Sequence, residues 1–134
     1  MIKLSLPTAR QEEFLDITGR LQSVVRESGV RQGLAVVFCP HTTCALTINE
    51  HADPDVRADI LMALRKIAPD TLPYAHGEGN SPAHVKASLL NQSLTIIIEG
   101  GEIQLGTWQG IFLCEFDGPR TRQLWIKLEA GDRG

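Results

Sequence analysis

The sequence predicts a compact single α+β domain over residues 1–134, with a mostly antiparallel or mixed, sandwich-like β-sheet, two main helices and one short helix. The first observation is length, because 134 residues suit one domain with a sizeable hydrophobic core. The second is composition, since 43% hydrophobic and 22% charged residues are ordinary for a globular chain. The third is order, because the strand-like segments gather toward the C-terminus and do not alternate with helices.

The N-terminal part is predicted to hold strands around one helix. Apolar and polar residues alternate over 2–6, which predicts a first strand. Thr8 and Gln11 fit a capping box for a helix that Gly29 ends, with its apolar face formed by Phe14, Ile17, Leu21, Val24 and Val25. The almost wholly apolar segment 33–39 predicts a buried central strand, and a further strand is expected over 41–49.

The rest of the chain is predicted to form two helices and then a run of strands. Asp53 caps the first helix, with Pro54 at its first position and Pro69 at its end. A loop rich in Pro, Gly and Asn follows over 69–82, and Ser81 then caps a short helix that ends near Leu90. The expected strands are 93–99, 102–105, 110–116 and 122–129.

Charge and hydropathy exclude two classes of partner. The net charge of -3 and the pI of about 5.8 argue against a nucleic-acid-binding protein, which normally presents a basic face. No apolar run approaches the roughly 20 residues that a membrane span needs, and the N-terminus lacks the pattern of a signal peptide. We therefore expect a cytoplasmic protein whose three cysteines, Cys39, Cys44 and Cys114, are reduced thiols.

The histidines suggest where the chemistry lies, because all four fall between positions 41 and 84. Three histidines with nearby carboxylates suit a divalent metal ion with an open coordination position, although the spacing matches no standard zinc motif. His41, His76 and His84 are the candidate ligands. On a regular strand His41 would face the same side as Thr43 and Asn49, and an ordinary solvent-facing strand explains that pattern equally well. His51 is interpreted as a solvated loop residue.

Other positions suggest a site for an anion. The two predicted helix N-termini, at Asp53 and Ser81, each offer free N–H groups to a phosphate or carboxylate. Thr107 and Gln109 could donate or accept neutral hydrogen bonds, while Trp108 is expected to point into the core. Arg120 follows a turn and is a candidate phosphate ligand. The GEG segment at 77–79 fits neither a P-loop nor a dinucleotide fingerprint.

Three segments resemble the YjbQ-like family of secondary thiamine-phosphate synthase enzymes: HTTCALTINEHADPDV, YAHGEGNSPAHVKASLL and GTWQGIFLCEFDGPR. The resemblance covers nearly the whole chain, and it implies a compact α+β fold, assembly as a homotrimer and a polar pocket near subunit contacts. The polar motif positions that it carries over are His41, Thr43, Asn49, Glu50, Asp53, His76, Glu78, Asn80, His84, Thr107 and Gln109. This chain departs from the motif at His51, where the family usually has Asn.

Two classes of function follow from the residues and the resemblance together. The first is a metal-assisted enzyme that acts on a small phosphorylated metabolite, with thiamine-phosphate-synthase-like transferase activity and zinc or magnesium as cofactor. In it Glu50, Glu78 and Asp53 are the candidate acid–base residues, and the substrate-binding candidates are Thr43, Asn49, Asn80, Thr107, Gln109 and Arg120. The second is a non-catalytic module that binds a small anionic metabolite. A metal-dependent phosphohydrolase would use the same ligands.

Overall fold

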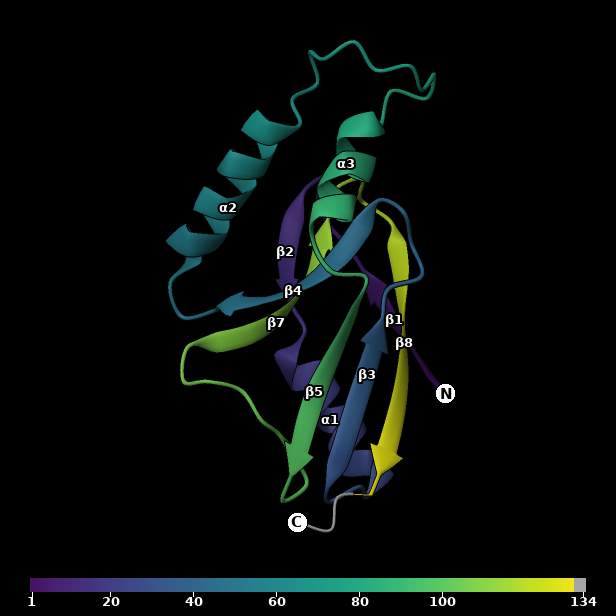
Figure 1. The fold of residues 1–134 in the computed structure, drawn as a ribbon, viewed down its shortest axis with the longest axis vertical. Helices are drawn as coiled ribbons and strands as arrows, with labels where there is room; N and C mark the ends of the chain where they lie inside the picture. Colours follow the sequence, from purple (N-terminus) through teal and green to yellow (C-terminus); the bar gives the residue numbers. More distant parts are fainter. Residues whose placement is uncertain (132–134) are drawn as a thin grey trace.

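The computed structural model describes residues 1–131 and is an α+β domain built from two antiparallel sheets and three helices (Figure 1). The N-terminal elements are β1 (Ile2–Pro7), β2 (Glu13–Asp16), α1 (Thr18–Ser28), β3 (Gly33–Phe38) and β4 (Cys44–Glu50). Two helices follow, α2 (Pro54–Ile67) and α3 (Ser81–Leu89). The C-terminal strands are β5 (Ser93–Glu99), β6 (Glu102–Ile103), β7 (Gln109–Glu115) and β8 (Thr121–Ala130). The predicted fold class is confirmed.

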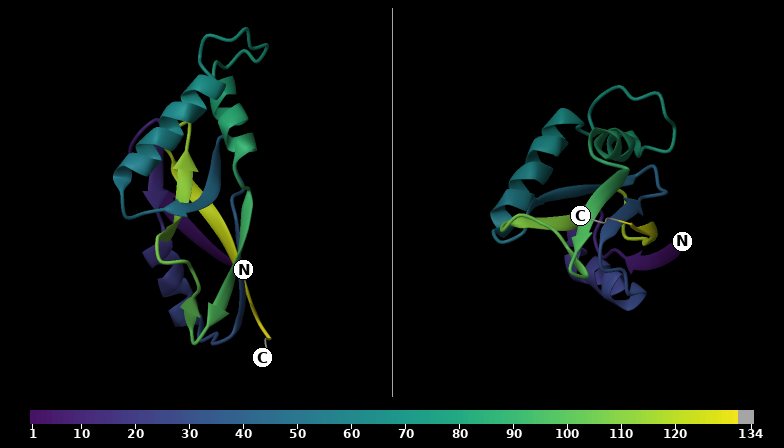
Figure 2. Two further views of the ribbon diagram at one scale, coloured as in Figure 1. Left: turned by 60° about the vertical axis from the view of Figure 1, so that its left-hand side comes forward. Right: turned by 60° about the horizontal axis from the view of Figure 1, so that its bottom comes forward.

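The strands form two sheets that pack on each other. The larger sheet has the order β1-β8-β3-β5-β6, and the smaller one has the order β2-β7-β4. All strand pairs among the described residues are antiparallel. One hydrophobic core fills the space between α1, the inner face of the larger sheet and one face of the smaller sheet. A second core lies on the other face of the smaller sheet, beneath α2 and α3 (Figure 2).

This layering explains which apolar run is fully buried. In β7 the residues from Gly110 to Glu115 are all buried, because the smaller sheet is covered on both faces. In β3 burial alternates instead. Val37 is 0% exposed, but Leu34, Val36 and Phe38 on the other face are 37–40% exposed. The segment 33–39 is therefore a central strand, as predicted, but it is buried on one side only.

The predicted helix from residue 8 is wrong over its first half. Residues 13–16 form β2, which pairs with β7, and α1 starts only at Thr18. The Glu13 carboxylate holds the segment before β2, because its Oε2 accepts the backbone N–H groups of Ala9 and Arg10 at 2.6 and 3.0 Å. The apolar spacing of Phe14 and Ile17 fits a helix, but pairing with a distant strand buries Phe14 better.

Smaller differences occur where loops replace regular elements. The predicted strand over 41–49 begins only at Cys44, so His41 and Thr43 lie in a loop and strand parity does not order them. Asn80, not Ser81, is the N-cap residue of α3. Trp108 is 63% exposed and does not enter the core, whereas Phe112 and Phe116 do. The three cysteines are free thiols, as expected. Within the described residues, no helix is long and apolar enough to cross a membrane.

Candidate functional site

Helix α2 separates the two polar regions that hold most of the candidate site residues, the strand-to-helix junction and the loop before α3. The strand-to-helix junction at 49–53 precedes its first residue, and the loop at 68–80 follows its last turn (Figure 1). A helix of 14 residues spans about 21 Å. Within one chain the junction and the loop therefore lie at opposite ends of α2 and do not form the two halves of one pocket.

The junction side chains mainly hold local backbone. Asp53 Oδ1 accepts the N–H of Asp55 at 2.9 Å, which is the N-cap of α2 that the sequence predicts. Glu50 Oε2 accepts the N–H of Asp53 at 3.2 Å, and Asn49 Oδ1 accepts the N–H of Glu50 at 2.7 Å. Gln109 Oε1 likewise accepts the N–H of Gly106 at 2.8 Å. These contacts give the four candidates a structural role, while the neighbouring Thr107 is exposed.

His51 lies in a loop, as expected, and 34% of its side chain is exposed, but its ring also contacts the protein. Its Nδ1 lies 3.1 Å from Asp16 Oδ2, and its ring lies directly against Gly110, where an added Cβ would come within 2.6 Å of it. Burial raises the pKa of Asp16, but hydrogen bonds from Thr18 and His51 outweigh it and lower the pKa overall. The contact between His51 and Asp16 thus connects the junction to the last residue of β2.

His41 and Thr43 lie in the loop between β3 and β4, where both contact β8. His41 Nε2 accepts the backbone N–H of Gln123 at 2.9 Å. Burial and the nearby Arg122 guanidinium lower the pKa of His41, which favours the neutral imidazole. Thr43 Oγ1 accepts a hydrogen bond of 2.9 Å from Arg122 Nη2. His41 thus lies with Thr43 and Arg122, away from the loop that carries His76.

Arg122 belongs to a buried ion pair that the sequence analysis did not find. Its guanidinium binds the carboxylate of Glu115, and the two residues are 4% and 0% exposed. Thr8 Oγ1 also donates to Glu115, at 2.8 Å. Because Glu115 belongs to β7 and Arg122 to β8, the pair joins the smaller sheet to the larger one. Burial opposes the charge on Arg122, but the bond to Glu115 raises the pKa of Arg122 overall.

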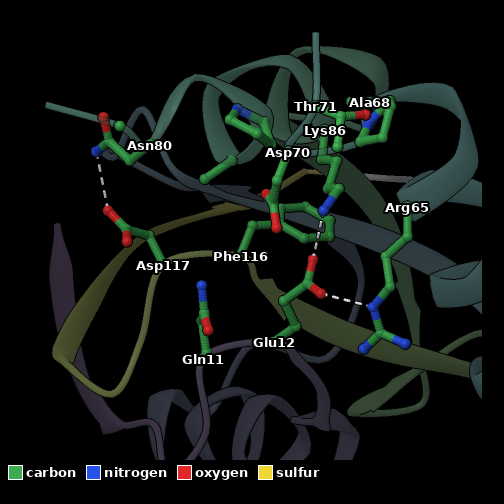
Figure 3. Close-up of a pocket in the computed structure, with 14 residues that line it drawn as sticks. Gln11, Glu12, Arg65, Ala68, Asp70, Thr71, Asn80, Lys86, Phe116 and Asp117 are labelled. Atoms are coloured by element: carbon green, nitrogen blue, oxygen red, sulfur yellow. Dashed lines mark hydrogen bonds and ion pairs between the residues drawn. The ribbon is translucent and has the colours of Figure 1, made fainter. Parts of the chain in front are cut away.

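A polar cavity of about 410 Å³ lies between α2, α3 and the ends of β2 and β7 (Figure 3). Its size is within the range of pockets that bind small molecules. We call it the α2–α3 cavity. Its lining residues are Gln11, Glu12, Arg65, Ala68, Pro69, Asp70, Thr71, Gly79, Asn80, Pro82, Ala83, Lys86, Phe116 and Asp117.

Two cations share one carboxylate at the wall of this cavity. Lys86 Nζ lies 2.7 Å from Glu12 Oε2, and Arg65 Nε lies 2.7 Å from Glu12 Oε1 (Figure 3). Burial raises the pKa of Glu12, but the hydrogen bonds from Lys86 and Arg65 prevail and lower it. The group of three therefore carries one net positive charge. The Lys86 side chain is 6% exposed and that of Arg65 is 55% exposed, so Arg65 is the more accessible cation.

Asn80 is the predicted site residue that the structure places in the cavity. Its Nδ2 donates to Asp117 Oδ2 at 3.0 Å, which fixes the orientation of the amide. Its Oδ1 is then a buried acceptor without a partner among the described residues. The N-terminus of α3 begins here, and no side chain caps it. Asp117 also binds Arg120, whose Nη2 lies 3.0 Å from Oδ2, so Arg120 is close to this wall.

The proposed metal ligands are only partly brought together. The rings of His76 and His84 lie at a centroid distance of 5.4 Å, and Glu78 is in the same exposed loop as His76. His41 is engaged with β8 instead. In residues 1–131, no group of three or more His, Cys, Asp and Glu side chains is arranged to hold a metal ion. The single chain thus supplies two adjacent histidines but not the predicted set of three.

The sequence analysis missed the charged residues of the cavity for a physical reason. Glu12 and Lys86 are separated by 74 positions, and only the docking of α3 against the β2 end joins them. One signal was present in the sequence: Lys86 belongs to the buried face of α3, together with Pro82, Ala83 and Ala87. A lysine in an apolar helix face is rarely buried unless it is paired.

Comparisons with known proteins agree with this fold. The model of the family described as "UPF0047 protein YjbQ-like" matches residues 2–131. The UPF0047 protein MJ1081 of Methanocaldococcus jannaschii is 48% identical over 99% of this chain and 96% of its own. The UPF0047 protein YugU of Bacillus subtilis is 45% identical over 93% and 96%, respectively.

Solved structures show the same architecture. A crystal structure of an uncharacterized conserved protein of the YjbQ/UPF0047 family from Clostridium acetobutylicum has a TM-score of 0.93 and 55% identity. It covers 96% of this chain and 100% of its own. A conserved hypothetical protein from Thermus thermophilus has a TM-score of 0.90 and 42% identity, with the same coverage.

Proposed function

Because the chain belongs to the UPF0047 YjbQ-like family, we propose that it is an enzyme that acts on a small phosphorylated metabolite in the α2–α3 cavity. Transfer chemistry like that of a thiamine-phosphate synthase is proposed as a secondary activity. The observation that carries the proposal is the polar cavity itself, where Arg65 and Lys86 lie on either side of Glu12, and where the N-terminus of α3 has no side-chain cap; the acidic residues Asp70 and Asp117 also line it.

The cavity suggests what such a substrate must offer. A phosphoryl group suits the Arg65 guanidinium, because a guanidinium can bind two phosphate oxygens at once. The buried Oδ1 of Asn80 is an acceptor, so the ligand should also carry an N–H or O–H donor. Phe116, which is 3% exposed, adds a small apolar contact at the same wall for the edge of a flat ring. A phosphorylated heterocycle with an amino or hydroxyl group meets all three requirements.

The transfer reaction joins a pyrimidine methyl diphosphate to a thiazole phosphate and releases pyrophosphate. Negative charge grows on the leaving diphosphate as the bond to carbon breaks. Arg65 and Lys86 are proposed to stabilise that charge, since cations already in position cost no reorganisation. Of the three candidate acid–base residues, Glu78 is nearest to the cavity along the chain, because Gly79 and Asn80 line it.

A divalent metal ion, zinc or magnesium, remains part of this proposal. His76 and His84 are adjacent and suit a zinc ion, which binds histidine nitrogen, better than magnesium, which prefers oxygen ligands. A bound ion would help neutralise diphosphate charge. The remaining ligands would have to come from the substrate, from water or from another subunit, so we assign the ion no step.

Assembly as a homotrimer is also proposed, and the outer face of the larger sheet supports self-association. Leu34, Val36 and Phe38 of β3 lie there with Ile97 of β5, and all four are 37–55% exposed. The helix α1 packs on the opposite face (Figure 2). A central strand with apolar side chains on both faces is usually covered on both faces, which is why contact with another chain is proposed here.

Light scattering of the purified protein tests the assembly. The wild type should have about the mass of three 14.7 kDa chains, and Val36→Asp should lower that mass. Met62→Asp is the matched control, because Met62 is 51% exposed but lies on α2, away from this face. An unchanged mass for Val36→Asp would remove this face from the assembly.

A turnover assay tests the enzymatic proposal. The purified protein is incubated with the pyrimidine methyl diphosphate and the thiazole phosphate, and formation of thiamine phosphate is followed with and without zinc or magnesium. Arg65→Gln should raise the KM for the diphosphate. Arg26→Gln is the control, because Arg26 is also an exposed helical arginine paired with a glutamate, Glu102, but lies on α1.

Each outcome of this assay discriminates between the functions. Binding of the diphosphate without product supports the non-catalytic binding module instead. Release of inorganic phosphate without transfer supports a phosphohydrolase. The proposed function is contradicted if no phosphorylated compound is bound and none is turned over.

A further inference from the structure

Two buried thiols meet beneath the loop that links β3 to β4. Cys39 directly follows β3 and Cys44 is the first residue of β4, and they are 1% and 0% exposed. Their sulfur atoms are 3.3 Å apart. The Cys39 Sγ also lies 3.4 Å from the carbonyl oxygen of Cys44. The proposed function uses neither thiol.

We propose that Cys39 and Cys44 are a redox modification site, at which a small peroxide converts the two thiols into an intramolecular disulfide within the folded protein. The first support is distance, because a disulfide bond is about 2.0 Å long and the sulfurs need to approach by only about 1.3 Å. The second is sequence separation, because the bond closes a loop of only a few residues and leaves the two sheets in place.

The surroundings give the two sulfurs different roles. The hydrogen bond with the Cys44 thiol, a backbone hydrogen bond from His41 and the nearby Arg122 guanidinium outweigh burial and lower the pKa of Cys39. The hydrogen bond between the two thiols, together with burial, raises the pKa of Cys44. Since the thiolate is the nucleophile, the lowered pKa favours Cys39 as the sulfur that attacks the oxidant and Cys44 as the one that resolves the product.

The reaction balances with hydrogen peroxide as the oxidant. The Cys39 thiolate attacks one peroxide oxygen, the O–O bond breaks, and the leaving hydroxide takes up the Cys39 proton to become water. The Cys44 sulfur then attacks the sulfenic acid sulfur, and the S–O bond breaks. The second hydroxide takes the Cys44 proton and leaves as water. The thiols lose two electrons and the peroxide gains two.

The disulfide would act on the loop that carries His41 and Thr43. Both residues contact β8, through the N–H of Gln123 and the guanidinium of Arg122. A bond between the two ends of this loop restricts its opening. Oxidation should therefore reduce hydrogen exchange of the loop amides and raise the melting temperature.

Mass spectrometry of the folded full-length protein after peroxide treatment tests the proposal. Trypsin cleavage after Arg31 and Arg57 places both cysteines in one peptide, residues 32–57, while Cys114 falls in another. The expected result is that peptide 32–57 loses the mass of two hydrogen atoms and resists alkylation after unfolding. Cys114 should still react with the alkylating reagent once the protein is unfolded.

Three variants sharpen the result. Cys114→Ala should form the disulfide like the wild type, whereas Cys39→Ala and Cys44→Ala should not. Peptide mapping of the wild type gives the answer even if a variant fails to fold. The proposal is overturned if the folded protein forms no disulfide under conditions in which the unfolded protein does, or if the bond involves Cys114 or a second chain.

Discussion

Replacing one member of the Glu115–Arg122 pair should destabilise the protein strongly. Glu115 is fully buried and receives hydrogen bonds from Arg122, from Thr8 and from the backbone N–H groups of Phe116 and Asp117. Glu115→Gln keeps the size of the side chain but removes its charge. It leaves the Arg122 guanidinium buried without a counter-ion, next to an amide group that is partly a donor.

The expected loss follows from the burial of both partners. Breaking a buried ion pair by removing one partner costs about 3–5 kcal/mol. For a chain of 134 residues this lowers the melting temperature by roughly 10–18 °C. Arg122→Met should cost a similar amount. The double variant Glu115→Gln with Arg122→Met removes both charges, so its loss should be smaller than the sum of the two single losses by about 2–3 kcal/mol.

Urea unfolding followed by circular dichroism measures these four proteins directly. The double-mutant cycle isolates the coupling between Glu115 and Arg122 from the other bonds of each residue. A loss below about 1 kcal/mol for Glu115→Gln would place the pair in the range of an exposed salt bridge and refute the reasoning. Additive losses would show that the two residues act independently and do not join the sheets as a unit.

Further predictions concern a glycine, a carboxylate and a helix cap. Gly118→Ala should cost about 1–3 kcal/mol in urea unfolding, because its Cβ would lie 2.3 Å from the carbonyl oxygen of Arg10; Gly77→Ala, with nothing within 4 Å, is the control. The folded pKa of Glu12 is lowered, so Glu12 stabilises the folded protein above about pH 4.5, and this stabilisation is lost as the pH falls through the folded pKa. Glu12→Gln should therefore flatten the acid limb of a plot of melting temperature against pH. Asp53→Ala should cost about 1 kcal/mol and Asp53→Asn much less; equal losses would contradict a capping role.

Local rules predict the elements whose signals lie within a few residues. Asp53 and Pro54 begin α2 where the capping preference predicts, and the C-terminal strands follow from their own apolar runs and turn residues. The error at β2 has a different cause. Phe14 and Ile17 are spaced as on a helix, and only pairing with β7, almost 100 positions later, decides for a strand. Such pairing is not visible in a local pattern.

The candidate site likewise contains residues that local signals predict and residues that only the folded chain brings together. Asn80 could be predicted because it lies in a polar loop before a helix start, and it lines the cavity. The cation pair on Glu12 depends on three segments that meet only in the folded protein. The junction residues were attractive because they are polar, yet their bonds satisfy the start of α2. Polarity at a helix start thus reflects capping as readily as ligand binding.

Calorimetric titration of the pyrimidine methyl diphosphate into the wild type, Arg65→Gln and Arg26→Gln tests most directly whether the α2–α3 cavity binds a phosphorylated metabolite. Loss of a charge-assisted hydrogen bond at a partly exposed site should raise the Kd of Arg65→Gln about tenfold. Arg26→Gln should bind like the wild type, since its side chain belongs to the pair with Glu102 on α1 and β6. Equal affinity in all three proteins, or binding in none, would contradict the assignment of the cavity.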